Sequence, residues 1–136
     1  HPGGKLGARL SFVRDVMHKD DEVPLVVNTS RMEKAVIEMT SKRFGCVGVT
    51  DGAGALVGII TDGDLRRHMK TSNDLLSESV ETVMTKKPMT VKADTMAAEV
   101  LALLNETKRS VVLVVDDAHK PVGIVHLHDL YRVGIA

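Results

Sequence analysis

The sequence is poor in aromatic residues and in cysteine. It has no Trp, one Tyr and two Phe among 136 residues, so it lacks the stacking platforms that bind single-stranded nucleic acid. Its 18 basic and 18 acidic residues cancel, which leaves no electrostatic footprint for DNA, RNA or an anionic membrane. The lone Cys46 excludes an internal disulfide. No signal peptide is recognised, and no apolar run approaches the roughly 20 residues of a membrane span. We therefore expect a cytoplasmic protein that binds neither nucleic acid nor membrane.

What the sequence does contain is an internal duplication. The stretch at 58–67, GIITDGDLRR, returns at 123–132 as GIVHLHDLYR. From Val26 onward the halves align at an offset of 65, and the Val-x-x-Val-Met segments at 13–17 and 80–84 align at an offset of 67. Chance does not produce so long a register, so the chain is one unit written twice.

Each half is predicted to follow the order β-α-β-β-α. Strands are expected at 23–27, 46–50, 55–60, 111–115 and 121–126, and helices at 8–17, 31–42, 61–69, 96–107 and after Leu127. Ser30 and Glu33 predict a capping box for the second of these helices, and Asp94 predicts an N-cap for the fourth. A half of about 60 residues buries its sheet poorly alone, so we expect the two halves to pack sheet to sheet about a pseudo-twofold axis.

The junction after each Gly-containing strand is the candidate site. A hydroxyl and free amides at a helix start favour an anion, and a carboxylate that accepts two vicinal hydroxyls distinguishes a ribose. Thr61 and Asp64 provide these groups in the first copy, whereas the second copy has His126 and Asp129. The alternative is that these residues only cap their helices. Arg67 and Lys86 could neutralise a phosphate, or belong to a solvated charged face.

Other patterns carry less. His126 and His128 are two residues apart, so on a continued strand both rings would point the same way and could clamp a metal ion. A structural metal site needs about four ligands, and we expect no metal and no required cofactor. Cys46 begins an apolar run and is predicted to be a small buried hydrophobe rather than a redox group.

Together these motifs resemble a CBS domain pair, or Bateman module, over residues 13–132. The resemblance rests on the tandem repeat, the Val-x-x-Val-Met segments, the MTKKPMTV loop at 84–91 and the Gly-apolar-apolar-Thr-x-x-Asp motif at 58–64. It implies an α+β fold of tandem CBS repeats at 13–72 and 80–136, joined by a linker at 73–79. Such pairs are regulatory and bind nucleotides in clefts between the repeats. The resemblance implies that Thr61 contacts a phosphate and that Asp64 bonds the ribose hydroxyls. It also implies that the base is held by Phe44, Gly45 and Cys46, and in the second repeat by their counterparts Ser110 and Val111.

The first residues, HPGGKLG, are similar to the joint between a sugar isomerase (SIS) domain and a CBS pair in D-arabinose 5-phosphate isomerases. The stretches DGDLRR at 62–67 and HLHDL at 126–130 fit the same family. This resemblance implies that residues 1–12 end an upstream SIS domain and that His1 matches an isomerase-site histidine. One His without a positioned acid, base and phosphate loop is no active site, so we expect no enzymatic activity from this chain.

The expected function is regulation of the attached isomerase by a bound nucleotide or nucleotide sugar. CMP-Kdo, a product of the lipopolysaccharide pathway that these enzymes begin, is favoured over AMP or ATP, because feedback control needs a pathway signal. A homodimer of CBS pairs is the expected assembly. Two other hypotheses stay open: a purely structural dimerisation module without ligand, and isomerase activity from the chain itself.

Overall fold

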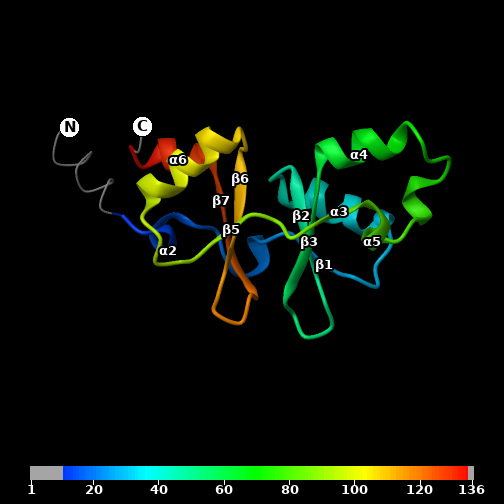
Figure 1. Cartoon of the computed structure of the whole chain (residues 1–136), viewed down its shortest axis with the longest axis horizontal. Helices are drawn as coiled ribbons and strands as arrows, with labels where there is room; N and C mark the ends of the chain where they lie inside the picture. Colours follow the sequence, from blue (N-terminus) through cyan, green and yellow to red (C-terminus); the bar gives the residue numbers. More distant parts are fainter. Residues whose placement is uncertain (1–10, 135–136) are drawn as a thin grey trace. The chain divides into compact units, whose positions relative to one another are not determined.

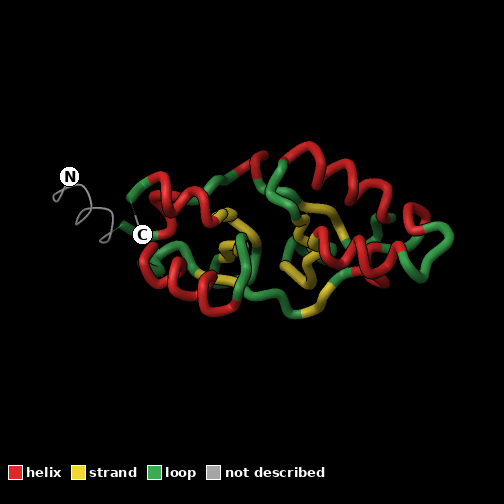
Figure 2. Tube along the Cα trace, turned by 90° about the horizontal axis from the view of Figure 1, so that it is seen from above, coloured by secondary structure: helices red, strands yellow, loops and turns green. Residues whose placement is uncertain are grey.

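The computed structural model describes residues 11–134, so His1 and the first part of the helix predicted at 8–17 lie outside the described range. Two compact units make up the chain (Figure 1), and each is described by itself. Unit 1 lies within residues 1–23, 89–117 and 122–136, and unit 2 comprises residues 24–88 and 118–121. Within each unit the helices gather on one side of the strands (Figure 2).

Unit 2 is built on a four-stranded sheet in the order β1-β2-β3-β4. Strand β1 is parallel to β2, whereas β3 runs antiparallel to both of its neighbours. The strands are β1 (Leu25–Val27), β2 (Cys46–Thr50), β3 (Leu56–Thr61) and β4 (Thr85–Lys86), and the helices are α3 (Met32–Lys42), α4 (Asp62–Met69), η2 (Leu75–Ser77) and α5 (Val80–Val83).

Unit 1 has a three-stranded sheet in the order β5-β6-β7, with β5 parallel to β6. The strands are β5 (Thr90–Val91), β6 (Val111–Val115) and β7 (Pro121–His126), and the helices are α2 (Val13–Val16), η1 (Asp20–Glu22), α6 (Ala97–Thr107) and α7 (Leu127–Arg132). The predicted α+β class and the β-α-β-β-α order of each repeat are confirmed.

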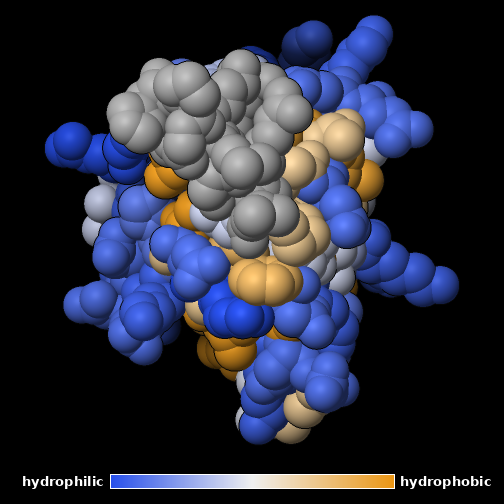
Figure 3. Space-filling model, turned by 90° about the vertical axis from the view of Figure 1, so that its left-hand side faces the viewer, coloured by the Kyte–Doolittle hydropathy of each residue, from blue (hydrophilic) through white to orange (hydrophobic). Residues whose placement is uncertain are grey.

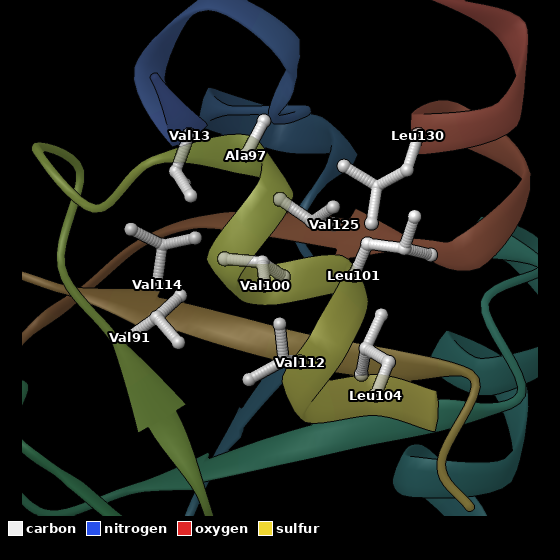
Figure 4. Close-up of a cluster of buried hydrophobic side chains, with 10 residues drawn as sticks. All are labelled: Val13, Val91, Ala97, Val100, Leu101, Leu104, Val112, Val114, Val125 and Leu130. Atoms are coloured by element: carbon white, nitrogen blue, oxygen red, sulfur yellow. The ribbon is translucent and has the colours of Figure 1, made fainter. Parts of the chain in front are cut away.

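The segment that leads into each repeat packs with the other repeat's strands. We call residues 11–18 and 78–85 the lead-in segments. Val13 of the first segment is fully buried in the core of unit 1, among side chains of α6 and the strands β5 to β7 (Figure 4). Val80 of the second is fully buried in the core of unit 2. The compact units therefore do not coincide with the sequence repeats.

The start of α3 shows what the lead-in segment contributes. Arg31 is the N-cap and its side chain makes no capping bond, so the predicted box between Ser30 and Glu33 is wrong. The Met32 amide instead donates to the Glu78 carbonyl at 2.8 Å. A backbone acceptor from the lead-in segment thus satisfies a helix-end donor that a side chain would otherwise have to satisfy.

The start of α6 repeats this arrangement. Its N-cap is Met96 rather than Asp94, with no side-chain capping bond, so the predicted Asp94 cap is wrong as well. The Ala97 amide donates to the Ser11 carbonyl at 2.8 Å. Ser11 and Glu78 are 67 residues apart, the offset that relates the two Val-x-x-Val-Met segments. The duplication therefore includes the exchange of lead-in segments.

The two cores consist mainly of Val, Leu, Ile and Met side chains. Each such side chain contributes about 1.5–3 kcal/mol to the free energy of folding when it is fully buried. Outside them the surface is largely polar, and hydrophilic residues dominate the face in Figure 3, with smaller hydrophobic patches between them. In the part of the chain that the structure describes, no helix combines the length and the apolar character needed to cross a membrane.

Candidate functional site

The junction between β3 and α4 holds a buried carboxylate. Asp64 is 3% exposed, and its Oδ2 accepts hydrogen bonds from the Thr61 amide at 2.9 Å and the Thr61 hydroxyl at 3.1 Å. The Asp64 amide donates in turn to Thr61 Oγ1 at 3.3 Å. These bonds form a capping box, which is the local reason why α4 begins directly after β3.

The other oxygen of Asp64 is bonded from two further elements. Thr85 of β4 donates its hydroxyl to Oδ1 at 3.2 Å, and the Arg67 guanidinium donates to the same oxygen. The Arg67 side chain is 67% exposed. A ligand hydroxyl can therefore replace the guanidinium at Oδ1 without opening the buried part of the cap.

Phe44, Gly45 and Cys46 lie beside this junction. Cys46 is paired with Thr61 across β2 and β3, and the Asp62 amide donates to the Gly45 carbonyl at 3.2 Å. Gly45 has a φ of +75°, and a Cβ there would lie 3.3 Å from Asp62 Oδ2, so glycine suits both the backbone and the space.

The Cys46 side chain is buried, whereas the Lys86 side chain is exposed to solvent. The Cys46 side chain is fully buried, as predicted; burial first, and then the charge of Asp62, raise the pKa of its thiol to about 12. Cys46 therefore offers a ligand its backbone and not a reactive thiolate. Lys86 is exposed and pairs with Gly58 on the outer strand β4.

Unit 1 has the corresponding junction between β7 and α7, with Asp129 at 6% exposure. The His126 amide donates to Asp129 Oδ2 at 2.8 Å, and the His128 amide donates to His126 Nδ1 at 3.0 Å. Arg132 places Nη1 at 3.6 Å from Asp129 Oδ1. His126 thus takes the capping role that Thr61 has in unit 2.

His18 completes the unit 1 junction. Its Nε2 lies 2.8 Å from Asp129 Oδ1, and its Nδ1 lies 2.8 Å from Glu22 Oε2. Neutral imidazole has one N–H, whereas imidazolium has two, so only the cation donates to both carboxylates. Burial alone would lower the pKa of His18, but the hydrogen bonds that its ring donates to Asp129 and Glu22, together with the charges of these carboxylates, raise it above its usual value.

Sequence reasoning missed His18 and Thr85 as partners of the two carboxylates. The available signal was the offset of 67, which aligns His18 with Thr85 directly after Met17 and Met84. Each residue ends a lead-in segment and reaches Oδ1 of the junction carboxylate in the unit where that segment packs.

His126 and His128 form a stacked pair and do not clamp a metal ion as two side chains of one strand would. The rings of His126 and His128 lie 4.7 Å apart at 14°, because α7 begins at Leu127 and the strand does not continue. Burial and the neighbouring charges of His128 and His18 lower the pKa of His126, against the opposing effect of Asp129. Within residues 11–134 no three His, Cys, Asp or Glu residues are arranged to hold a metal ion.

The remaining predicted residues, Ser110 and Val111, lie beside the β7–α7 junction of unit 1. Val111 begins β6, and the Ser110 carbonyl accepts a hydrogen bond from the Leu127 amide at 2.8 Å, as Gly45 does from Asp62 in unit 2. The structure thus divides the predicted site residues into two groups. Those in unit 2 are Phe44, Gly45, Cys46, Thr61, Asp64, Arg67 and Lys86, and those in unit 1 are Ser110, Val111, His126, His128 and Asp129.

A glycine in each Gly-containing strand lets the lead-in segment approach. A Cβ on Gly58 would lie 2.4 Å from Met84 Sδ, and one on Gly123 would lie 2.4 Å from Met17 Sδ. Close contact between methionine and strand brings Thr85 and His18 within reach of their carboxylates. These glycines therefore belong to the architecture of the two junctions.

The CBS domain family matches the chain at residues 13–71 and 80–135. The chain therefore belongs to the CBS domain family, as a tandem pair, and the resemblance noted from its motifs is confirmed.

Among curated proteins, the chain is 42% identical over 136 residues to arabinose 5-phosphate isomerase KdsD of Pseudomonas aeruginosa, covering 99% of this chain and 42% of that protein. It is 38% identical to KdsD of Escherichia coli K12, covering 99% and 41%. The uncharacterized protein RP505 of Rickettsia prowazekii is 39% identical, with coverage of 100% and 42%. The chain thus spans about two fifths of the length of these relatives.

Two solved structures extend the comparison. The crystal structure of CBSX2 in complex with AMP has a TM-score of 0.77 at 26% identity, covering 91% of this chain and 96% of that one. The CBS domain pair of protein MJ0100, in complex with 5′-methylthioadenosine and S-adenosyl-L-methionine, has a TM-score of 0.76 at 29% identity, covering 91% and 95%.

Proposed function

We propose that this CBS pair is the regulatory, nucleotide-sensing part of an arabinose 5-phosphate isomerase. The identity to KdsD proteins over the whole chain supports the context, and the adenosyl compounds in CBSX2 and MJ0100 support a nucleotide as ligand. Catalysis would belong to an SIS domain upstream of this pair, and this chain would act as regulator and not as enzyme.

The observation that carries the proposal is the buried Asp64 carboxylate at the β3–α4 junction, flanked by a hydroxyl and an exposed guanidinium. In the proposed complex the ribose hydroxyls take the place of Arg67 at Asp64 Oδ1. The freed guanidinium then pairs with a phosphate, for which its planar set of donors is suited. Phe44, Gly45 and Cys46, beside the junction, supply backbone and apolar contacts for the base.

The Asp129 junction is the second proposed site, with Ser110 and Val111 in the corresponding positions for the base. Imidazoles replace the two threonine hydroxyls there, so this junction suits a ligand with an additional acidic group. We propose CMP-Kdo, a nucleotide that carries an acidic sugar, ahead of AMP or ATP.

Regulation follows if the ligand binds one conformation of the pair more tightly than another. A ligand shifts an equilibrium only by its differential affinity, typically about 1–3 kcal/mol of coupling. The attached isomerase would respond through the chain that joins it to the first lead-in segment.

Calorimetric titration of the 136-residue chain with CMP-Kdo and with AMP tests the proposal. Asp64→Asn keeps the shape of the side chain but loses the charge, and we expect it to abolish binding at the β3–α4 junction. Asp74→Ala, at an exposed position of unit 2, is the matched control and should bind as the parent does. Unchanged affinity in Asp64→Asn would remove this residue from the site. Heat and a thermal shift with AMP but none with CMP-Kdo would reject the nucleotide sugar.

An assembly role is the second candidate, and exposed apolar side chains favour it. Ile37, Met69 and Leu76 of unit 2 are 64%, 66% and 50% exposed. Burying such residues in a homodimer is favourable by about 25 cal/mol per Å² of apolar surface. Sedimentation of the chain with and without nucleotide separates the two functions: a dimer that neither binds nor responds to nucleotides would support assembly alone.

A further inference from the structure

A pocket of about 530 Å³ lies in unit 2 apart from the Thr61 and Asp64 side chains, which do not line it. Its floor is apolar and consists of Leu56 and Val57 at the start of β3, with Met84 and Pro88. Leu56 is almost fully buried and the other three are half-buried. The volume falls within the roughly 300–1,000 Å³ of small-molecule sites, so the pocket has room for more than a bare inorganic ion.

The rim of this pocket carries basic side chains only. Lys86, Lys87 and His119 line it, and no acidic residue does. Among the described ion pairs none includes either lysine. Arg67, Arg132 and Lys92, by contrast, all contact carboxylates. In a chain with zero net charge, this rim is a local concentration of positive charge that lacks an internal counter-charge.

A hollow of similar size in unit 1 shows that size alone does not produce this character. It measures about 520 Å³, and its lining includes Glu99 and Glu106 beside Lys92. Because acidic and basic side chains both line this hollow, its charge favours neither an anionic nor a cationic ligand. The unit 2 pocket therefore differs in electrostatics rather than in dimensions.

The backbone at the rim is held in an uncommon conformation. Lys87 and His119 have φ values of 52° and 62°, in the left-handed region, which costs about 1 kcal/mol or more for a residue with a Cβ. Arg43 and Lys108 share this conformation, but both terminate helices, where it is usual. At the pocket both residues with this conformation contribute basic side chains to the lining.

Neighbouring contacts fix the pocket. Lys86 is paired with Gly58 in the sheet, and the Leu56 amide donates to the His119 carbonyl at 2.9 Å. Met84, part of the floor, is the side chain that packs on Gly58. The floor and the rim backbone are thus preorganised, which lowers the entropic cost of binding.

We propose that this pocket is a binding site for a small organic anion, in which Lys86 and Lys87 hold a phosphate, sulfonate or carboxylate group while the apolar floor contacts the body of the molecule. Thr61, Asp64 and Arg67 do not line this pocket, whereas Lys86, which the sequence grouped with them, does, so the proposal assigns Lys86 to this pocket and does not depend on nucleotide binding at the β3–α4 junction. Its ligand has an acidic group and an apolar face in one molecule, as aryl and nucleoside phosphates do.

Anilinonaphthalene sulfonate is a suitable probe because it joins a sulfonate to an aromatic body, and its fluorescence rises when it leaves water. We expect the 136-residue chain to bind one molecule. The double variant Lys86→Gln/Lys87→Gln should bind about tenfold more weakly or worse, because both charge-assisted contacts are lost. Lys34→Gln/Lys70→Gln removes two exposed lysines elsewhere in unit 2 and should bind within twofold of the parent. Equal affinity in the two double variants would overturn the proposal.

Further variants separate this site from the proposed nucleotide site and from misfolding. Lys86→Arg/Lys87→Arg keeps both charges and should keep probe binding. Asp64→Asn, which disables the β3–α4 junction, should also bind the probe normally; a loss there would place the probe at the junction and reject the pocket. In NMR spectra the probe should shift the amides of Leu56, Val57 and Lys87. Shifts confined to residues 44–46 and 61–64 would refute the assignment.

Discussion

Replacing His18 by Thr tests how the unit 1 junction is held together. The substitution gives unit 1 the residue that unit 2 uses at the aligned position, Thr85, whose uncharged hydroxyl donates to the Asp64 carboxylate. The side chain of Asp129 is 7% exposed and that of His18 is 27% exposed, and His18 Nε2 lies 2.8 Å from Asp129 Oδ1. A hydrogen bond to a charged group contributes about 1.5–3 kcal/mol, and we place the imidazolium at the upper end of this range and the threonine hydroxyl at the lower end because only the imidazolium is itself charged. The exposed Glu22 pair adds only a few tenths, about 0.3 kcal/mol. We expect a net loss of about 1–2 kcal/mol in the free energy of unfolding at low pH.

The sign of the pH dependence follows from the raised pKa of His18. Stability from a group whose pKa is higher in the folded state is fully present below its unfolded pKa, about 6.5, and is lost as the pH rises through its folded pKa. The facing groups are Glu22 and Asp129, with Arg132 and His126 next to Asp129. The stability difference between parent and variant should therefore be largest below pH about 6.5 and should decrease as the pH rises from there into the alkaline range.

Thermal unfolding of both proteins across this pH range measures the difference. At the acidic end we expect the variant to melt about 3–8 °C lower. Thr29→Ala, which replaces an exposed and uncharged side chain of unit 2, is the control and should show a constant difference across the range. The reciprocal Thr85→His should introduce a similar pH dependence into unit 2. If the His18→Thr difference were independent of pH, or grew toward alkaline pH, the doubly bonded imidazolium would be refuted.

Three further predictions concern the close contacts and the cores. Gly58→Ala should lower the free energy of unfolding by about 1–3 kcal/mol through overpacking, and by less in a Met84→Ala background; equal losses in both backgrounds would exclude the contact with Met84 Sδ. Cys46 should not react with a thiol reagent at pH 8 until the protein unfolds, because its pKa is raised to about 12 by burial; rapid reaction of the folded protein would contradict this. Val13→Ala should cost about 2 kcal/mol and raise amide exchange in 97–107, and Val80→Ala should do so in 32–42; a reversed pattern would show that the lead-in segments are not exchanged.

Much of each repeat could be predicted from local pattern. The turn at 51–54 between two apolar runs formed as expected, with the Asp51 side chain accepting from the Ala53 and Ala55 amides at 2.9 and 3.0 Å. The helix predicted at 31–42 is found at Met32–Lys42. These features depend on turn chemistry and apolar periodicity within a few residues, and such information is fully present in the sequence.

Contacts between the lead-in segments and the other repeat could not be predicted in this way. Ser30 and Asp94 have the right chemistry for N-caps, yet both helix starts are satisfied by carbonyls of Glu78 and Ser11. Local propensity cannot indicate that a distant backbone group will occupy the same position. An internal alignment does identify the paired positions, but not that they exchange partners.

The position of the β3–α4 junction was predictable from the motif, but the hydrogen-bond partners of its carboxylate were not. Thr61 and Asp64 were expected either to cap α4 or to bind a ligand, and the cap is formed. Capping does not compete with the proposed ligand role, since the Thr61 bonds use Oδ2 while the exposed Arg67 bonds Oδ1. Both interpretations of the motif can therefore hold for one carboxylate.

The two junctions differ in a coordinated way that no single substitution explains. Both threonines that contact Asp64, one before the helix and one from the lead-in segment, correspond to histidines at Asp129. Asp129 accepts a hydrogen bond from the His126 amide and lies 2.8 Å from His18 Nε2, and the charge of His18 contributes to lowering the pKa of His126. The Asp64 junction thus combines two hydroxyls with the Arg67 guanidinium, and the Asp129 junction combines the His18 imidazole with Arg132. Because both ring nitrogens of His18 are engaged by Glu22 and Asp129, the difference between the repeats is a difference in the charge held around the buried carboxylate.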